Sequence, residues 1–369
     1  MSDDQKCTCV CYQESVRPAN PGAANQESRR KRKRKSEVNT MTKSEEDNYP
    51  KERESFKRET RHENVECVPF TIKEPTKTFR VGRNLERQHT SKLVELIREF
   101  IDVFARVTED MPGVNKDIAL HRLHVDPLFI LVKQWKRTFS EEKNLAIREE
   151  VASLLKAGAI RELQFPSWIA NLVLVEKPNN KWRMCIYFKN LNKACPKYFY
   201  PLPWLGRLVD GSAGHEVCDF MDASRGYHQI RMLPKDEEET TFITDYDLYC
   251  KRVMPFGLKN VVATYQWMVY TILEPQIGHN MKIYVDDMLF KIKVRSEHLE
   301  NLKETFVWLK LNRLKLNPEK CSFGVTFGKF LGYMMSERGI EPNPDKIKAL
   351  LEMKPPNSYK DIQKLTDVW

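Results

Sequence analysis

Two adjacent aspartates, Asp286 and Asp287, interrupt an apolar stretch that extends over Met281–Phe290. The aliphatic and aromatic residues on either side favour β-strands, whereas aspartate favours turns. The pattern therefore predicts a tight hairpin, set in a buried sheet, with both carboxylates at its tip. Carboxylates this close repel each other, and a divalent cation such as Mg²⁺, which prefers hard oxygen ligands, would remove that repulsion.

The same pair also fits an ordinary hairpin whose polar tip faces water. A third aspartate, Asp222, favours the functional interpretation, because it ends another predicted strand over Val217–Asp222. Gly226 and Tyr227 follow closely. Whether the three carboxylates meet depends on how the two strand segments are placed in the sheet.

The chain has 369 residues, enough for two or three compact units, and carries a formal net charge of +10 with a pI of about 9.0. This surplus fits a polyanionic partner, most simply nucleic acid, although charge alone is weak evidence. No apolar run is long enough for a membrane span, and the N-terminus lacks a signal-peptide core. The nine scattered cysteines favour reduced thiols in an intracellular protein over secretion. We expect the protein in cytoplasmic particles, in the nucleus or in both.

Residues 1–66 are polar, charged and poor in large apolar side chains, so we expect a disordered segment. Within it, Arg29–Lys35 is an unbroken basic run, which fits a nuclear-import address, a phosphate-binding arm or simply a solvated tail. Cys7, Cys9 and Cys11 have no second ligand pair at zinc-finger spacing, so we do not expect a zinc site there.

The rest of the chain mixes predicted helices and strands without strict alternation, which indicates the α+β class. Residues 67–117 form a predicted helical extension, because apolar side chains over Leu93–Phe104 recur at helical spacing. Two apolar runs, Ala170–Glu176 and Trp182–Phe188, predict a hairpin with a basic, turn-rich tip. The cations at and beside that tip fit either phosphate binding or ordinary surface charge.

Six sequence blocks occur in order along the chain. They are K-W-R-M-C-I-Y-F-K-N-L-N-K-A-C-P at 181–196, F-M-D-A-S-R-G-Y-H-Q-I-R-M at 220–232, V-M-P-F-G-L-K-N at 253–260, Y-V-D-D-M-L at 284–289, L-N-P-E-K-C-S-F-G at 316–324 and F-L-G-Y-M-M-S-E-R-G-I at 330–340. Together they resemble the reverse transcriptase domain of gypsy-type LTR retrotransposons, especially those of plants. The resemblance covers about Ile118–Trp369, and the ordered series is more specific than any single motif.

The resemblance implies a right-hand polymerase with an antiparallel palm sheet. The fingers would comprise residues 118–196 and 229–255. The palm would comprise 197–228 and 256–342, including a primer-grip hairpin, and 343–369 would be the start of a truncated thumb.

The resemblance also implies an RNA-directed DNA polymerase that adds a deoxynucleotide to a primer 3′-hydroxyl by two-metal catalysis. Asp222 and Asp286 would bind both Mg²⁺ ions, for which Mn²⁺ could substitute. Asp287 would assist, and the backbone carbonyl of Ala223 would be a further ligand. The partners would be an RNA/DNA template–primer and dNTPs. We would also expect the RNase H and integrase regions of a parent polyprotein beside the domain, and we do not find them in this sequence.

By the same resemblance, several other residues would contact substrates. Arg183, with Lys177 or Lys181, would grip the incoming triphosphate, and Tyr227 would exclude a ribose 2′-hydroxyl. Phe256 and Gly257 would form the floor of the nucleotide pocket, and Gln266 would face the template. The primer grip would consist of Phe330, Leu331, Gly332 and Tyr333.

Departures from the family pattern favour a second hypothesis, a catalytically decayed, truncated remnant that binds nucleic acid without turnover. Tyr187 stands where relatives carry aspartate, Arg225 where they carry a small residue, and Val261–Val262 replace a small pair. A cation close to Asp222 could compete with metal, and β-branched side chains add volume behind the nucleotide pocket. A clipped thumb would also weaken the hold on duplex. The intact aspartates favour the active enzyme.

Overall fold

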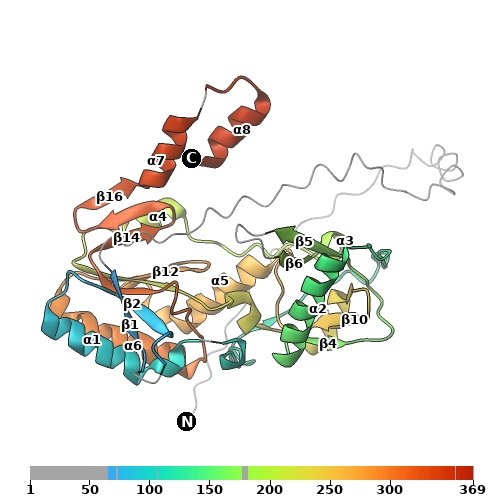
Figure 1. Ribbon diagram of the computed structural model, residues 1–369, viewed down its shortest axis with the longest axis horizontal. Helices are drawn as coiled ribbons and strands as arrows, with labels where there is room; N and C mark the ends of the chain where they lie inside the picture. The colour runs from blue at the N-terminus through green and yellow to red at the C-terminus, as the bar shows by residue number, and fades with distance from the viewer. Residues whose placement is uncertain (1–64, 72–73, 106, 177–181, 354, 369) are drawn as a thin grey trace, which may run out of the picture. The chain divides into compact units, whose positions relative to one another are not determined.

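The computed structural model describes residues 65–71, 74–105, 107–176, 182–353 and 355–368. Its largest sheet has six strands in the order β1-β2-β13-β7-β12-β11 (Figure 1). Neighbouring strands pair antiparallel except β2 and β13, which are parallel. This antiparallel-rich sheet among helices confirms the predicted α+β class. The strands are Val65–Pro69 (β1), Thr78–Gly82 (β2), Val217–Asp222 (β7), Met281–Tyr284 (β11), Asp287–Ile292 (β12) and Ser322–Val325 (β13).

The N-terminal extension, predicted over 67–117 as a helical linker, contains the helix α1 (Arg87–Glu99) and also contributes two strands to this sheet. Strand β1 begins at Val65, inside the segment predicted to be disordered, whose residues 1–64 lie outside the described ranges. In β2 the buried residues alternate, and Phe79 and Val81 have no exposed surface. Because the partner strand β13 is distant in sequence, local periodicity could not reveal this pairing.

Two glycines make the junction between β2 and β13 possible. A Cβ at Gly82 would lie 2.1 Å from the carbonyl oxygen of Gly324, closer than real Cβ contacts occur. Gly324 itself has a φ of +63°, and a Cβ there would lie 2.4 Å from a methyl group of Leu85. The extension therefore packs against the sheet through direct backbone contact, which only residues without a side chain permit.

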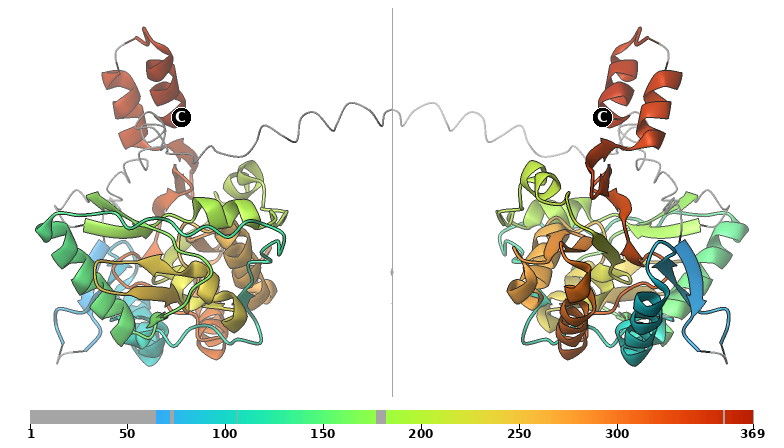
Figure 2. Two further views of the ribbon diagram at one scale, coloured as in Figure 1. Left: turned by 90° about the vertical axis from the view of Figure 1, so that its right-hand side faces the viewer. Right: turned by 90° about the vertical axis from the view of Figure 1, so that its left-hand side faces the viewer.

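One face of the sheet is covered by helices, among which α1 and α6 lie side by side (Figures 1 and 2). The rings of Phe100 and Phe306 meet there, with their centroids 5.6 Å apart. Met221 of β7 and Met288 of β12 belong to the same large core, which also takes residues from α5. The three helices are Arg87–Glu99 (α1), Val261–Ile272 (α5) and His298–Leu311 (α6).

A buried polar chain crosses this helix-covered face. Asp219 of β7 is fully buried, and its carboxylate lies 2.9 Å from Nε2 of His298 and accepts a 2.5 Å hydrogen bond from the backbone N–H of Gly324. The other ring nitrogen of His298 lies 2.9 Å from Nε2 of His89, on α1. These hydrogen-bonded side chains tie α1 and α6 to β7, and both oxygens of the buried Asp219 carboxylate have partners.

The opposite face of β7 and β12 is covered by α4 and by the hairpin of β14 and β15. Phe220, Leu289 and Phe330 are buried together there. A Cβ on Gly328 would lie 2.2 Å from the ring of Phe220, so β14 packs directly onto β7. Asp222 follows Phe220 by two residues and therefore faces the same side. These elements are Leu205–Asp210 (α4), Phe327–Phe330 (β14) and Tyr333–Ser336 (β15).

The segments predicted to form the fingers build smaller sheets. The hairpin predicted after Ala170 is confirmed, because β5 and β6 pair antiparallel. No helix of the described residues is long and apolar enough to cross a membrane, and Cys67, Cys195, Cys218, Cys250 and Cys321 are free thiols. The remaining elements are Leu120–His121 (β3), Glu141–Lys156 (α2), Ile160–Glu162 (β4), Leu172–Glu176 (β5), Trp182–Ile186 (β6), Lys189–Ala194 (α3), Arg231–Met232 (β8), Phe242–Ile243 (β9), Leu248–Lys251 (β10), Gly339–Pro342 (β16), Pro344–Glu352 (α7) and Tyr359–Val368 (α8).

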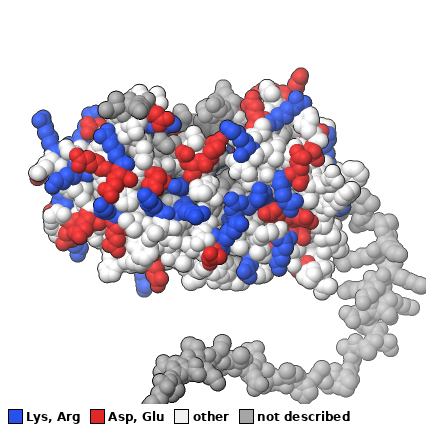
Figure 3. All heavy atoms as spheres, turned by 90° about the horizontal axis from the view of Figure 1, so that it is seen from below, with Lys and Arg blue, Asp and Glu red and all other residues white. Residues whose placement is uncertain are grey.

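Charged side chains of both signs are interspersed on the face that Figure 3 shows. This face therefore does not present the uniformly positive surface that a net charge of +10 would allow. Net charge alone does not locate a nucleic-acid-binding surface on the molecule.

Replacing Gly82 with alanine is expected to destabilise the domain by about 2 kcal/mol, because the added Cβ would force two backbones apart. Gly206→Ala is the matched control, since Gly206 lies in α4 and a Cβ there would meet Trp204 at 3.7 Å. Alanine favours helices, so the control should be as stable as the wild type or slightly more stable. Urea denaturation followed by circular dichroism measures both, and equal stability of the two variants would contradict the close approach.

A buried histidine makes the stability depend on pH. His121 of β3 is 1% exposed, and its Nδ1 lies 3.1 Å from the hydroxyl of Thr264 on α5. Burial, with a smaller contribution from the charge of His124, lowers the pKa of His121 from 6.5 to about 4. The folded protein therefore keeps this ring neutral at a pH at which the unfolded chain protonates it.

Stability is accordingly expected to fall as the pH drops from about 6.5 towards 4, and the loss due to His121 at pH 5 should be about 2 kcal/mol. Urea denaturation at pH 7 and pH 5 measures the loss. His121→Gln should reduce the difference between the two pH values by this amount. The exposed His279 provides a control, because His279→Gln should leave the difference unchanged.

Candidate active site

The two adjacent aspartates lie where β11 turns into β12. Tyr284 pairs with Asp287, so Val285 and Asp286 alone form the turn. The prediction that both aspartates occupy the tip is therefore corrected by one residue, since Asp287 is the first residue of β12. Val285 has a φ of +52°, a conformation that a β-branched residue rarely adopts and that costs energy.

A glutamine from α5 holds this strained turn. The backbone N–H of Val285 donates a 2.6 Å hydrogen bond to the side-chain oxygen of Gln266, whose amide nitrogen donates to the carbonyl of Ile283 at 3.4 Å. Gln266 has no exposed surface. The side chain braces the hairpin from inside, and its predicted contact with the template stays a prediction.

The third aspartate lies directly across from the second. Strands β7 and β12 pair antiparallel, with Asp222 and Asp287 as register partners, so both side chains project from the same face. Burial first, and then the charges of Asp286 and Asp222, raise the pKa of Tyr265 well above its ordinary value. Tyr265 is thus close enough to both Asp286, in the turn, and Asp222, on β7, for their negative charges to act on it. The register confirms that the two strand segments bring the acidic residues to one edge.

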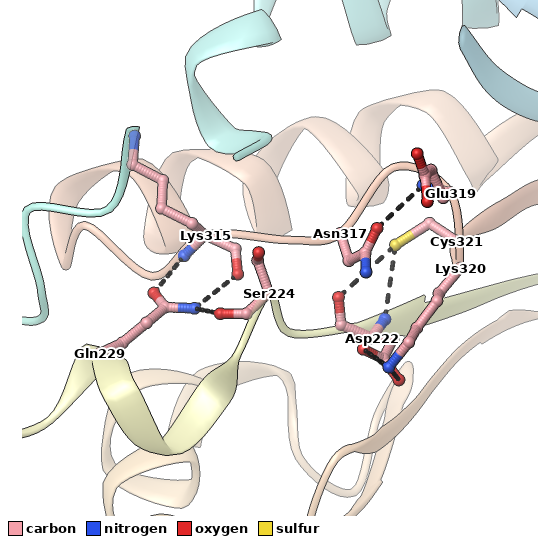
Figure 4. A network of polar contacts seen from close by, with 8 residues as sticks. All are labelled: Asp222, Ser224, Gln229, Lys315, Asn317, Glu319, Lys320 and Cys321. Carbon is pink, nitrogen blue, oxygen red and sulfur yellow. Dashed lines mark hydrogen bonds and ion pairs between the residues drawn. The ribbon is translucent and has the colours of Figure 1, made fainter. Parts of the chain in front are cut away.

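A loop clamps the end of β7 in place (Figure 4). The backbone N–H of Asn317 donates to the carbonyl of Asp222 at 2.8 Å, and that of Ser224 donates to the carbonyl of Lys315 at 2.9 Å. The side chain of Gln229 donates to the carbonyls of Ser224 and Lys315 and accepts from the N–H of Lys315. In this antiparallel pattern the carbonyl of Ala223, between the two bonds, points away from the loop.

The same loop places a cation on the first carboxylate. The Nζ of Lys320 lies 3.0 Å and 3.2 Å from the two oxygens of Asp222. The thiol of the neighbouring Cys321 lies beneath the strand and accepts from the N–H of Asp222 at 3.4 Å. Lys320 stood inside a recognised sequence block but was not predicted to take part, and its contact joins residues far apart in sequence.

The carboxylates suit a divalent metal ion by chemistry and by register. Asp222 and Asp287 supply hard oxygen atoms from adjacent strands, and Asp286 follows in the turn. Within the described residues, however, no three His, Cys, Asp or Glu side chains are grouped closely enough to hold a metal ion. Lys320 occupies both oxygens of Asp222, so an ion bound at those oxygens would have to displace it.

An aromatic cluster adjoins the acidic edge. The ring of Tyr227, which is 7% exposed, has its centroid 4.7 Å from that of Phe256 and 5.3 Å from that of Tyr265. Phe256 is 57% exposed and presents its outer surface to solvent. Gly257 has a φ of +94°, and a Cβ there would lie 3.3 Å from the carbonyl oxygen of Ile186. This loop therefore packs against the end of β6, the strand that carries Arg183.

The other predicted substrate residues are only partly located. Arg183 lies within β6, the second strand of the hairpin that β5 and β6 form. Lys177 and Lys181 lie outside the described residues. A hairpin is present at the predicted place, because Phe330 pairs with Tyr333 around a two-residue turn, and its contact with a primer stays a prediction. The turn is formed by Leu331, with a φ of +51°, and Gly332, with a φ of +85°.

The three departures from the family pattern occupy different environments. Arg225 is exposed and adopts a φ of +43° in the turn after Asp222. Of the valine pair at the start of α5, Val261 is buried at 5% exposure and Val262 is partly exposed. The backbone N–H of Tyr187 donates to the carbonyl of Asn171 at 2.9 Å. None of these positions disturbs the pairing of β7 with β12.

Comparison with known proteins agrees with this geometry. Residues 175–335 match the family described as reverse transcriptase (RNA-dependent DNA polymerase). The chain is 29% identical over 285 residues to the retrovirus-related Pol polyprotein from transposon 297 of Drosophila melanogaster, which covers 76% of this chain and 26% of that protein. It is also 29% identical over 274 residues to the transposon Tf2-3 polyprotein of Schizosaccharomyces pombe. This match covers 74% of this chain and 20% of that protein.

Solved structures of foamy viral protease-reverse transcriptase share the fold. The structure in complex with an RNA/DNA hybrid has a TM-score of 0.69 at 18% identity and covers 77% of this chain and 38% of that chain. A structure in complex with double-stranded DNA has a TM-score of 0.70 at 19% identity and covers 77% and 49%. The right-hand polymerase fold is thereby confirmed, whereas the gypsy type and the limits of fingers, palm and thumb stay predictions. Over residues 175–335 this chain is therefore similar to the reverse transcriptase domain found in retrotransposon polyproteins.

Proposed function

We propose that the domain catalyses RNA-directed DNA synthesis, adding a deoxynucleotide to the 3′-hydroxyl of a primer. The observation that carries this proposal is the register that sets Asp222 opposite Asp287, next to the turn that holds Asp286. The chain spans about a quarter or less of the length of the two relatives compared, so activity, substrates and partners are inferred from its own site.

Divalent metal ions, Mg²⁺ or in its place Mn²⁺, are the proposed cofactors. Asp222 and Asp286 would hold them, with Asp287 assisting and the carbonyl of Ala223 as a further oxygen ligand. Such ions lower the pKa of an attacking hydroxyl and stabilise the charge that develops on the phosphate. The protein contributes a fixed edge, because the loop around Asn317 and the side chain of Gln266 hold the two acidic segments.

The surface beside the aromatic cluster is the proposed site of the incoming dNTP. Tyr227 would lie beneath the sugar, and Phe256 and Gly257 would form the floor. The Tyr227 ring contacts both Phe256 and Tyr265, and these contacts hold it in place. A fixed ring supports a steric role at the sugar. Arg183, with Lys177 or Lys181, is proposed to bind the triphosphate, because a guanidinium can donate two hydrogen bonds to one phosphate.

An RNA or DNA template–primer is the proposed partner. The hairpin around Leu331 and Gly332 packs onto the strand that ends at Asp222, so it lies on the catalytic face. Tyr333 is 45% exposed and is available for contact with a primer terminus. The solved foamy viral reverse transcriptases, which hold an RNA/DNA hybrid or double-stranded DNA, support this type of partner.

Each of the single changes Asp222→Asn, Asp286→Asn and Asp287→Asn is expected to lower primer extension on poly(rA)·oligo(dT). The loss should be at least about 100-fold for Asp222 and Asp286, because each removes a charge that would hold the metal ions. Asp117→Asn, which changes an exposed aspartate on a loop, should retain wild-type activity.

Template–primer binding, measured by fluorescence anisotropy, separates this proposal from the decayed remnant. The asparagine variants should still bind the duplex while failing to extend it. A wild-type chain that binds the duplex but extends no primer with Mg²⁺ or Mn²⁺ would instead support the remnant.

Tyr227→Ala is expected to relax discrimination against ribonucleotides about tenfold or more, because the ring that would meet a 2′-hydroxyl is removed. The ratio of kcat/KM for dTTP and UTP on the same template measures this selectivity. Tyr265→Phe is the control, since within the described residues its buried hydroxyl has no hydrogen-bond partner. Unchanged selectivity in Tyr227→Ala would contradict the steric role.

A further inference from the structure

Strand β7 carries two aspartates whose polar partners differ in kind. Asp219 has no exposed surface, and its partner His298 is equally buried. Asp222 is 11% exposed at its side chain, whereas its partner Lys320 is 54% exposed. The first pair is enclosed by protein on all sides. The second pair has its cation on the solvent side, where it can be exchanged.

The backbone beneath Lys320 is fixed. Within the loop, the side-chain oxygen of Asn317 accepts from the N–H of Glu319 at 3.0 Å, and its carbonyl accepts from the N–H of Lys320 at 3.2 Å and of Cys321 at 3.1 Å (Figure 4). The loop is in turn bonded to the carbonyl of Asp222. Removing the ammonium group from the carboxylate therefore requires rotation of the lysine side chain only, and no movement of the loop.

Lys320 occupies the oxygens that a metal ion would need. Its Nζ lies within 3.2 Å of both oxygens of Asp222, and Asp287 lies directly opposite on β12. Without a cation the two carboxylates would repel each other. A divalent ion at the same oxygens would supply the positive charge instead, and the ammonium group cannot remain at that distance beside it.

We infer that Lys320 is a displaceable counter-ion of Asp222: it stabilises the acidic edge until a divalent cation binds, and that cation displaces it. The inference rests on the proposed function only in requiring that the cation binds at Asp222. It assigns to Lys320 a positioning role that precedes catalysis, and it predicts a competition between one side chain and the metal ion.

Lys320→Met, which keeps the length of the side chain and removes its charge, is the test. Competition predicts that Mn²⁺ binds this variant about threefold more tightly than the wild type, in keeping with the strength of a partly exposed ion pair. In EDTA the variant should unfold at a lower temperature than the wild type, and Mn²⁺ should raise its Tm by more. Lys320→Arg retains the charge and should behave like the wild type in both measurements.

Lys310→Met is the matched control. Lys310 is 53% exposed and forms a 3.1 Å ion pair with Asp102, away from the acidic edge. The same substitution there should leave Mn²⁺ affinity unchanged. Titration of the full chain with Mn²⁺, followed by the electron paramagnetic resonance signal of the unbound ion, gives the affinities without any enzymatic assay.

Asp222→Asn distinguishes failure of this inference from failure of the proposed function. If Asp222→Asn loses Mn²⁺ binding while Lys320→Met binds Mn²⁺ no more tightly than the wild type, the competition is refuted and the metal site stands. If Asp222→Asn binds Mn²⁺ as the wild type does, the metal assignment fails and the inference fails with it. Tighter binding in Lys320→Met, absent in Lys310→Met and lost in Asp222→Asn, supports the inference.

Discussion

The antiparallel pairing of β7 with β12 is the constraint on which the candidate active site depends. It sets Asp222 opposite Asp287, and it leaves Asp286 in the turn immediately before. Because side chains alternate along a strand, a slip of one residue would turn one aspartate into the helix-covered core. The large apolar side chains around Met221 and Met288 prevent that slip, since they fill the core only in this register. Core packing thus determines the chemistry of the edge.

The sheet separates two kinds of polar interaction. On the helix-covered face, Asp219, His298 and His89 form a closed chain that joins three elements and has a structural role. On the opposite face, Asp222 pairs with Lys320 at the border of solvent. Carboxylates three residues apart on one strand therefore have different environments because they project from opposite faces of the sheet. Enclosure favours permanent partners, whereas exposure permits exchange.

The sequence predicted those parts of the fold that depend on local patterns. The hairpins at Val285 and Leu331, the strand ending at Asp222 and the overall class were all readable from short apolar runs and turn residues. The two strands of the extension and the contact of Lys320 were not, because each joins segments far apart in the chain. The position of the turn was misjudged by one residue, since a valine at positive φ contradicts ordinary turn preferences. Tertiary contacts from Gln266 overcome that preference.

Backbone strain gathers around the same site. Within the described ranges five residues other than glycine have positive φ, and three of them are Arg225 after the first aspartate, Val285 beside the second and Leu331 at the tip of the hairpin on the catalytic face. Each conformation costs free energy that the surrounding contacts must offset. At Val285 the bond from Gln266 does so, and at Arg225 the carbonyl accepts from the N–H of His228 at 2.8 Å. Specific bonds therefore hold the strained backbone on both sides of the acidic edge, as the proposed metal-dependent chemistry would require.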